Sequence, residues 1–229
     1  MRLEPLGDSA VLATLGSGID AATLASVLSF ADSIVAAKRA GITDVVPAYS
    51  TVTAFYDPAQ FSAAPGDAYD AVCLFLKSCA AGAKAERHDG AGRRVEIPVC
   101  YGGDFGPDLE AVAEHCAMSA DAAVALHSGA DYLVHAIGFT PGFPYLGGLP
   151  EALRTPRRDT PRQRVPAGSV AIGGSQTGVY PVDSPGGWHI IGRTPMALFR
   201  PHYEPAALLK SGDHVRFKSI TPAELESWR

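Results

Sequence analysis

Hydrophobic residues recur at helical spacing near the start of the chain. Leu24, Val27 and Ile34 fall on one face of a helix, which predicts an amphipathic helix over residues 20–40. Short runs of β-branched and aromatic residues predict strands, and a further apolar stretch predicts a second helix. The expected elements are strands at 9–15, 44–49 and 51–56 and a helix at 67–81. This order predicts a small α/β sandwich domain over residues 1–88, with its helices on one face of a sheet.

The hydrophobic pattern changes to mainly strands further along the chain. A polar, charged stretch at 83–94 separates the two parts and is the expected boundary. Helices are predicted at about 106–117 and 119–129, between a strand at 94–99 and a series of later strands. Those later strands are expected at 132–138, 169–172, 179–182, 188–191, 197–200 and 214–218. Many short strands joined by Gly and Pro turns predict a closed or nearly closed β-barrel domain over residues 89–229. The expected fold class is therefore α+β followed by a mainly-β barrel.

The composition of the chain argues against several classes of function. The chain has 229 residues, 47% of them apolar, and a formal net charge of −5, which gives no reason to expect nucleic acid or an anionic membrane as partner. The longest apolar helical stretch, 21–37, is interrupted by Asp32 and is too short to span a bilayer. No signal-type segment opens the chain, so a cytoplasmic location is expected. The four cysteines lack C-x-x-C spacing and the seven histidines lack ligand spacing, which predicts reduced thiols and no metal site.

The segment 138–199 is dense in glycine, proline and arginine. Glycine permits close approach and proline fixes φ, so this mixture specifies a defined loop path. The run 173–178 has the glycine spacing that begins a P-loop, but Val179 and Tyr180 stand where a lysine and a hydroxyl residue are needed. The same run lacks the second glycine of a nucleophile elbow. A hairpin is the better interpretation.

Five arginines lie within eleven residues, at 154, 157, 158, 162 and 164, and the only acid among them is Asp159. A guanidinium binds carboxylate or phosphate through two N–H groups, so the cluster indicates either an anion site or a solvated basic loop. Arg157 and Arg162 each follow a proline, which stiffens the backbone that presents them. Within 184–189, a proline- and glycine-containing run precedes Trp188 and His189. His189 is either a structural histidine or an acid/base group.

These elements together resemble the allophanate hydrolase subunit 1 family. The matching runs are GFTPGFPYL at 138–146, PRRDTPRQRVPAGSVAI at 156–172, QTGVYP at 176–181, SPGGW at 184–188 and IGRTP at 191–195. An early GDSA at 7–10 and the closing GDHVRF at 212–217 extend the resemblance over nearly the whole chain. The family implies a cyclophilin-like β-barrel in the C-terminal part and a homologous second subunit that helps to form the active cleft.

The resemblance implies one subunit of an ATP-dependent 5-oxoprolinase, which opens the lactam of 5-oxoproline to give glutamate and is inactive alone. It implies the homologous second subunit and a lactam-utilisation subunit as partners. ATP would bind only together with the partner subunit, and Mg²⁺ is a further candidate cofactor. His189 is then the expected acid/base, with substrate or anion contacts from Arg157, Arg162, Arg193, Tyr145 and Gln176. Two alternatives stay open: a binding protein that inhibits a histidine kinase, and a carboxyltransferase-like subunit of a urea carboxylase or allophanate hydrolase system.

Overall fold

The computed structural model describes residues 1–61, 67–82 and 92–228, and the chain divides into two compact units, Met1–Gly92 and Arg93–Arg229. The boundary expected between residues 88 and 89 lies outside the described residues. Each unit has a hydrophobic core of its own. Among the helices of the described residues, none is long and apolar enough to cross a membrane.

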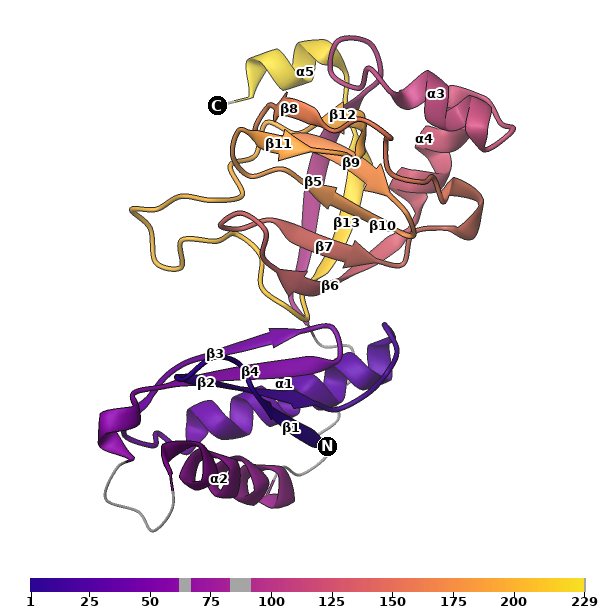
Figure 1. Ribbon diagram of the computed structural model, residues 1–229. Helices are drawn as coiled ribbons and strands as arrows, with labels where there is room; N and C mark the ends of the chain where they lie inside the picture. The colour runs from indigo at the N-terminus through magenta and orange to yellow at the C-terminus, as the bar shows by residue number, and fades with distance from the viewer. Residues whose placement is uncertain (62–66, 83–91, 229) are drawn as a thin grey trace. The chain divides into compact units, whose positions relative to one another are not determined.

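The first unit is a four-stranded antiparallel sheet with helices packed on one face (Figure 1). Its elements are β1 (Arg2–Pro5), β2 (Ala10–Thr14), α1 (Ala21–Ala36), β3 (Ile42–Ala48), β4 (Thr51–Tyr56), a 3₁₀ turn (Pro58–Gln60) and α2 (Ala68–Gly82). The strand order is β1-β2-β4-β3. Asp20 caps α1 by accepting a hydrogen bond from the backbone N–H of Thr23, which explains where this helix begins.

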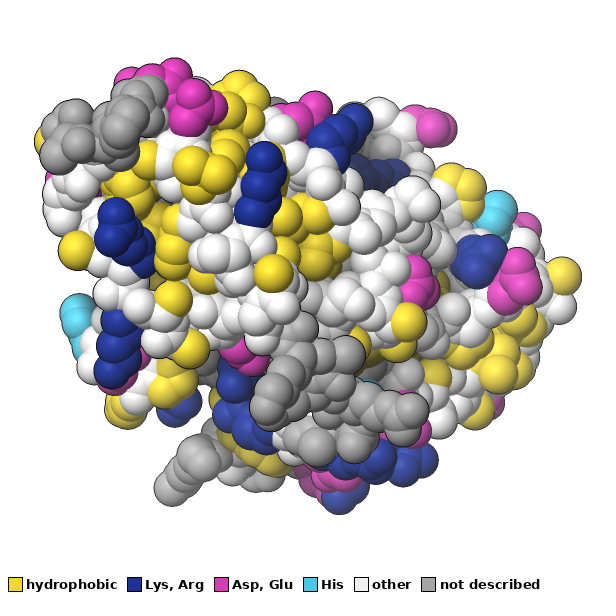
Figure 2. Space-filling view, turned by 90° about the horizontal axis from the view of Figure 1, so that it is seen from below, with side chains coloured by type: hydrophobic (Ala, Val, Ile, Leu, Met, Phe, Trp, Pro, Cys, Tyr) yellow, Lys and Arg dark blue, Asp and Glu magenta, His cyan; other side chains and the backbone are white. Residues whose placement is uncertain are grey.

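The helices of the first unit bury one face against the sheet. Val27, Phe30 and Ile34 of α1 meet Val72 and Leu76 of α2 in the core of the unit. Figure 2, which is turned by 90° from the view of Figure 1 and seen from below, shows hydrophobic side chains interspersed with Lys and Arg. Scattered exposed hydrophobic side chains of this kind are normal on protein surfaces.

The second unit is built on a closed seven-stranded barrel in the order β10-β7-β6-β13-β5-β12-β9. The barrel strands are β5 (Arg94–Tyr101), β6 (Asp131–Ile137), β7 (Pro144–Gly147), β9 (Ser169–Gly173), β10 (Gln176–Val179), β12 (His189–Arg193) and β13 (His214–Ser219). A separate ribbon pairs β8 (Arg162–Val165) with β11 (Ser184–Gly186). The barrel predicted from the sequence is confirmed.

Helices and turns complete the second unit (Figure 1). They are α3 (Leu109–His115), α4 (Ala120–Gly129), a 3₁₀ turn (Glu151–Leu153) and α5 (Pro222–Ser227). Leu109, Val112 and Ala123 from α3 and α4 join the barrel core. A smaller second core lies around Phe143 and Trp188.

Three predictions about the second unit were wrong. The strand expected at 179–182 lies at Gln176–Val179 instead. No strand spans residues 197–200, where Phe199 forms only an isolated bridge to Ala207. The chain was expected to contain only strands and turns beyond Tyr132, but α5 is a helix. It begins with a capping box in which Thr221 and Glu224 satisfy each other's backbone N–H groups. That signature is present in the sequence and could have located the helix.

Candidate functional site

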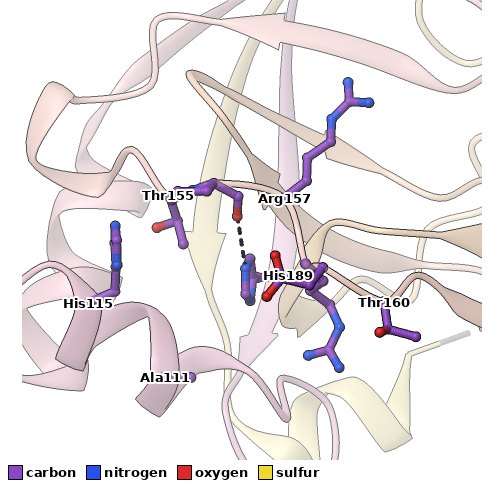
Figure 3. Close-up of a pocket in the computed structure, with 9 residues that line it drawn as sticks. Ala111, His115, Thr155, Arg157, Thr160 and His189 are labelled. Atoms are coloured by element: carbon purple, nitrogen blue, oxygen red, sulfur yellow. Dashed lines mark hydrogen bonds between the residues drawn. The ribbon is translucent and has the colours of Figure 1, made fainter.

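A pocket of about 590 Å³ lies beside α3 and the start of β12, under the loop at 154–160 (Figure 3). It is lined by Ala111, His115, Thr155, Pro156, Arg157, Arg158, Asp159, Thr160 and His189. Two of the residues predicted for the site, Arg157 and His189, therefore line one cavity. His115, on the last turn of α3, was not predicted, because nothing in its own sequence neighbourhood marks it.

His189 is the first residue of β12 and lies in the middle of the pocket (Figure 3). Its Nε2 is 3.0 Å from the carbonyl oxygen of Pro156. A carbonyl oxygen only accepts hydrogen bonds, so Nε2 carries the proton and the neutral ring keeps its lone pair on Nδ1. Nδ1 is buried and has no hydrogen-bond partner among the described residues. The lone pair of the ring therefore lies on a buried atom.

A buried carboxylate, Asp108, lies immediately before α3 and connects the elements that line the pocket. Both carboxylate oxygens of Asp108 bind the guanidinium of Arg162, each at 2.8 Å. Arg158 donates to Oδ1 at 3.1 Å, and the backbone N–H of Ile190 donates to Oδ2 at 2.7 Å. Asp108 thereby ties α3, the loop, β8 and β12 together.

The charge of Asp108 is stabilised where it lies. Burial by itself would raise the pKa of this carboxyl, but the hydrogen bonds from Arg162 and the Ile190 N–H and the two arginine charges lower it overall. Asp108 is therefore ionised, and Arg158 and Arg162 are its counter-ions. Sequence reasoning missed Asp108, because its arginines are 50 and 54 residues away along the chain.

Arg157 points away from His189 (Figure 3). Its guanidinium carbon lies 5.9 Å from the ring centre of Trp188, a cation–π arrangement. The ring of Tyr145 packs edge-on against Trp188 at 6.0 Å. Burial raises the pKa of Tyr145, and the charge of Arg157 partly offsets that increase. Arg157 and Tyr145 thus share one aromatic face of the barrel.

The structure also gives positions for the remaining predicted residues, Gln176, Arg162 and Arg193. Gln176 begins β10 and pairs in register with Gly173, against which the Trp188 ring is packed, so it lies at the edge of the aromatic face. Arg193 is four residues beyond His189 on β12, a separation of about 13 Å along a strand. The structure groups His189 with the pocket and Arg157, Tyr145 and Gln176 around Trp188. Arg162 lies against Asp108, and Arg193 lies apart.

This arrangement can support proton transfer and anion binding. His189 is the candidate group for proton transfer because it lines the pocket, and the pocket also offers arginine, histidine and threonine side chains to an oxyanion. Within the described residues no group of three His, Cys, Asp or Glu side chains could hold a metal ion.

Comparison with known protein families shows which family the chain resembles. The sequence model described as carboxyltransferase domain, subdomain C and D, matches residues 1–209. A 5-oxoprolinase subunit of Bacillus subtilis is 40% identical over 232 residues, covering 100% of this chain and 96% of that protein. These matches confirm the family resemblance predicted from the motifs.

Two solved structures are similar as well. The structure of TTHA0988 is 40% identical with a TM-score of 0.79; the match covers 92% of this chain and 40% of that longer one. Urea carboxylase of Kluyveromyces lactis is 18% identical with a TM-score of 0.76, covering 98% of this chain and 22% of that one. At that identity the second likeness shows the fold alone.

Proposed function

Because the chain belongs to the family of carboxyltransferase subdomains C and D, we propose that it is the corresponding subunit of an ATP-dependent 5-oxoprolinase. The observation that carries the proposal is the 40% identity, along this entire chain, to the 5-oxoprolinase subunit of Bacillus subtilis. The reaction proposed is opening of the 5-oxoproline lactam to L-glutamate. The proposed location is the cytoplasm.

The chemistry explains the residue types in the pocket. An unactivated lactam is a poor electrophile, and ATP would supply activation by phosphorylating it. The chain's own residues then have two tasks. Fixed cationic donors hold the negative charge of the substrate carboxylate and of a phosphorylated species, and the ring of His189, which lines the pocket, accepts a proton. We propose that Arg157 supplies the charge and His189 the proton acceptor.

The proposal includes partner subunits. We propose a homologous second subunit and a lactam-utilisation subunit, and we expect the isolated chain to be inactive. The length of the TTHA0988 chain supports a paired arrangement, because the match covers only 40% of it and leaves a large further portion there. ATP binding is assigned to the complex and not to named residues of this chain.

The test is reconstitution of 5-oxoproline cleavage from purified subunits. Glutamate release should require this chain, both partners and ATP. His189→Gln should lower kcat by a factor of about 10² to 10⁴, the range that an acid/base group contributes. His202→Gln, at an exposed loop position, is the matched control and should retain full activity. Glutamate release that does not change when this chain is left out would exclude the proposal.

A second candidate is a carboxyltransferase-like role, favoured by the matching family model, which is described as a carboxyltransferase domain. The two functions give opposite results in one assay. Carboxyl transfer needs a biotinylated partner, whereas lactam cleavage does not. Dependence of turnover on added biotinylated carrier would select the second candidate. The kinase-inhibitor alternative predicts binding to a kinase helix with no turnover in either assay.

A further inference from the structure

The arginine-rich segment at 154–164 is largely neutralised by acids from elsewhere in the second unit. Within residues 92–228, four of its five arginines form ion pairs with carboxylates. The pairs are Arg154–Glu151, Arg158–Asp108, Arg162–Asp108 and Arg164–Asp183. Arg157 forms no such pair among these residues. The sequence singles out both Arg157 and Arg162 by their preceding prolines, but the structure pairs Arg162 with Asp108 and so distinguishes Arg157 from the other four.

The four pairs are not equally strong. Arg154 and Arg164 are exposed, so water screens their ion pairs and a ligand could compete for them at little cost. Arg158 and Arg162 are partly buried against a carboxylate that is itself buried. Removing Arg162 from Asp108 would leave a buried charge without its main partner, which is costly. Asp108 therefore retains Arg158 and Arg162.

Arg157 has the opposite environment. Its side chain is exposed, and its guanidinium lies over the Trp188 ring. A ring under the guanidinium restrains its position but does not use its N–H groups, so they remain available to an oxyanion. The loop that carries Arg157 is fixed at the preceding residue, where the Pro156 carbonyl accepts the hydrogen bond from His189.

We infer that Arg157 is the arginine of this segment that binds the oxyanion of a ligand, and that Asp108 is the positioning residue that withholds Arg158 and Arg162 from it. The ligand group is a carboxylate or a phosphate. The inference deepens the proposed function and rests on it only for the identity of the substrate. Its test uses binding, which does not depend on lactam cleavage.

The first measurement is calorimetric titration of the full chain with inorganic phosphate. Arg157→Gln should weaken phosphate binding by about tenfold, the loss expected for one close charge contact in partly screened surroundings. Arg164→Gln removes the same charge from the same segment and should change the affinity less than about twofold, because its ion pair is exposed. Equal weakening by the two substitutions would mean a diffuse basic surface, and would overturn the inference.

A parallel titration with acetate distinguishes a carboxylate site from a phosphate site. If neither anion binds to the wild-type chain, the inference is also overturned.

The second measurement tests Asp108 with a substitution that should strengthen phosphate binding, whereas Arg157→Gln should weaken it. Asp108→Asn keeps an oxygen for the Ile190 N–H but releases the charge of both arginines, so phosphate should bind about tenfold more tightly. In the double variant Asp108→Asn/Arg162→Gln, the added charge is removed again and the wild-type affinity should return. A residue that only maintained the fold would give weaker binding in both variants, contrary to the inference.

A matched control separates charge from stability. Asp213 is also a buried carboxylate, bound by Arg93 at 2.8 Å and by the backbone N–H of Lys210 at 3.0 Å. It precedes β13, whose first residue pairs with Arg94, at the opposite end of β5 from the contact with β12. Asp213→Asn should lower the thermal unfolding midpoint and leave phosphate affinity unchanged. A change in affinity there as large as that of Asp108→Asn would contradict the positioning role.

Discussion

At the scale of single residues, His127 shows how completely the barrel determines the protonation of a side chain. It extends from α4 into the core, where Nδ1 lies 2.8 Å from the Tyr101 hydroxyl and Nε2 lies 2.9 Å from Oγ1 of Thr177. The ring also stacks on Phe217. Burial lowers the pKa of His127 to about 3, so the ring is neutral in the folded protein.

This environment predicts a pH dependence of stability. The folded pKa lies below the unfolded value of about 6.5, so the unfolded chain binds the extra proton as pH falls below 6.5. From this residue, the free energy of unfolding should decrease by about 1.4 kcal/mol per pH unit between pH 6 and 4. Urea denaturation across that range would measure the slope. His127→Gln should flatten it and His202→Gln should not; equal slopes in all three proteins would exclude the effect.

At the scale of elements, strand β9 carries a glycine where the Trp188 ring packs onto the barrel. A Cβ added at Gly173 would lie 2.5 Å from Cδ2 of that ring. Trp188 in turn lies beneath Arg157 and beside Phe143 and Tyr145. The flat contact between strand and ring thus supports the whole aromatic face.

Gly173→Ala should therefore displace Trp188 and destabilise the second unit by about 1–3 kcal/mol, as overpacking of a core does. Tryptophan fluorescence should shift to longer wavelength, because the ring becomes more exposed. Gly138→Ala is the control: a Cβ there meets nothing within 4 Å, so its spectrum and stability should match the wild type. An unchanged spectrum in Gly173→Ala would show that the ring can be accommodated elsewhere.

Local signals located most of the elements, and long-range contacts account for what was missed. The helix expected at 20–40 begins after its Asp20 cap but ends at Ala36. His189 and Arg157 could be predicted as candidates because proline, glycine and aromatic residues surround them in sequence, and both line the pocket. Asp108 could not be found in this way, because its partners come from β8, β12 and the 154–160 loop. The same reasoning could not show that three acids outside the segment form ion pairs with four of its arginines.

At the scale of the whole molecule, closure of the barrel depends on a strand near the end of the chain. β13 lies between β5, to which it is parallel, and β6, to which it is antiparallel. It contributes Val215 and Phe217 to the core. The family match ends at residue 209, before this strand begins.

A chain shortened to residues 1–209 should therefore fail to form the barrel. Loss of β13 would leave β5 and β6 as open edges, which favour aggregation. Size-exclusion chromatography should find the shortened protein in aggregates. Removal of residues 222–229 alone takes away α5, which has no buried residues, and should leave a monodisperse, folded protein. A folded, monodisperse 1–209 chain would contradict the role given to β13.

The position of β13 also sets an order for folding during synthesis on the ribosome. All four strands of the first unit lie within the first 56 residues, so its sheet can pair early. The barrel cannot close until residue 219 has left the exit tunnel, and until then β5 and β6 wait without the strand that joins them. While residues 94–218 are being made, the nascent second unit therefore lacks the strand that joins β5 to β6, and this is the period in which chaperone protection would matter most.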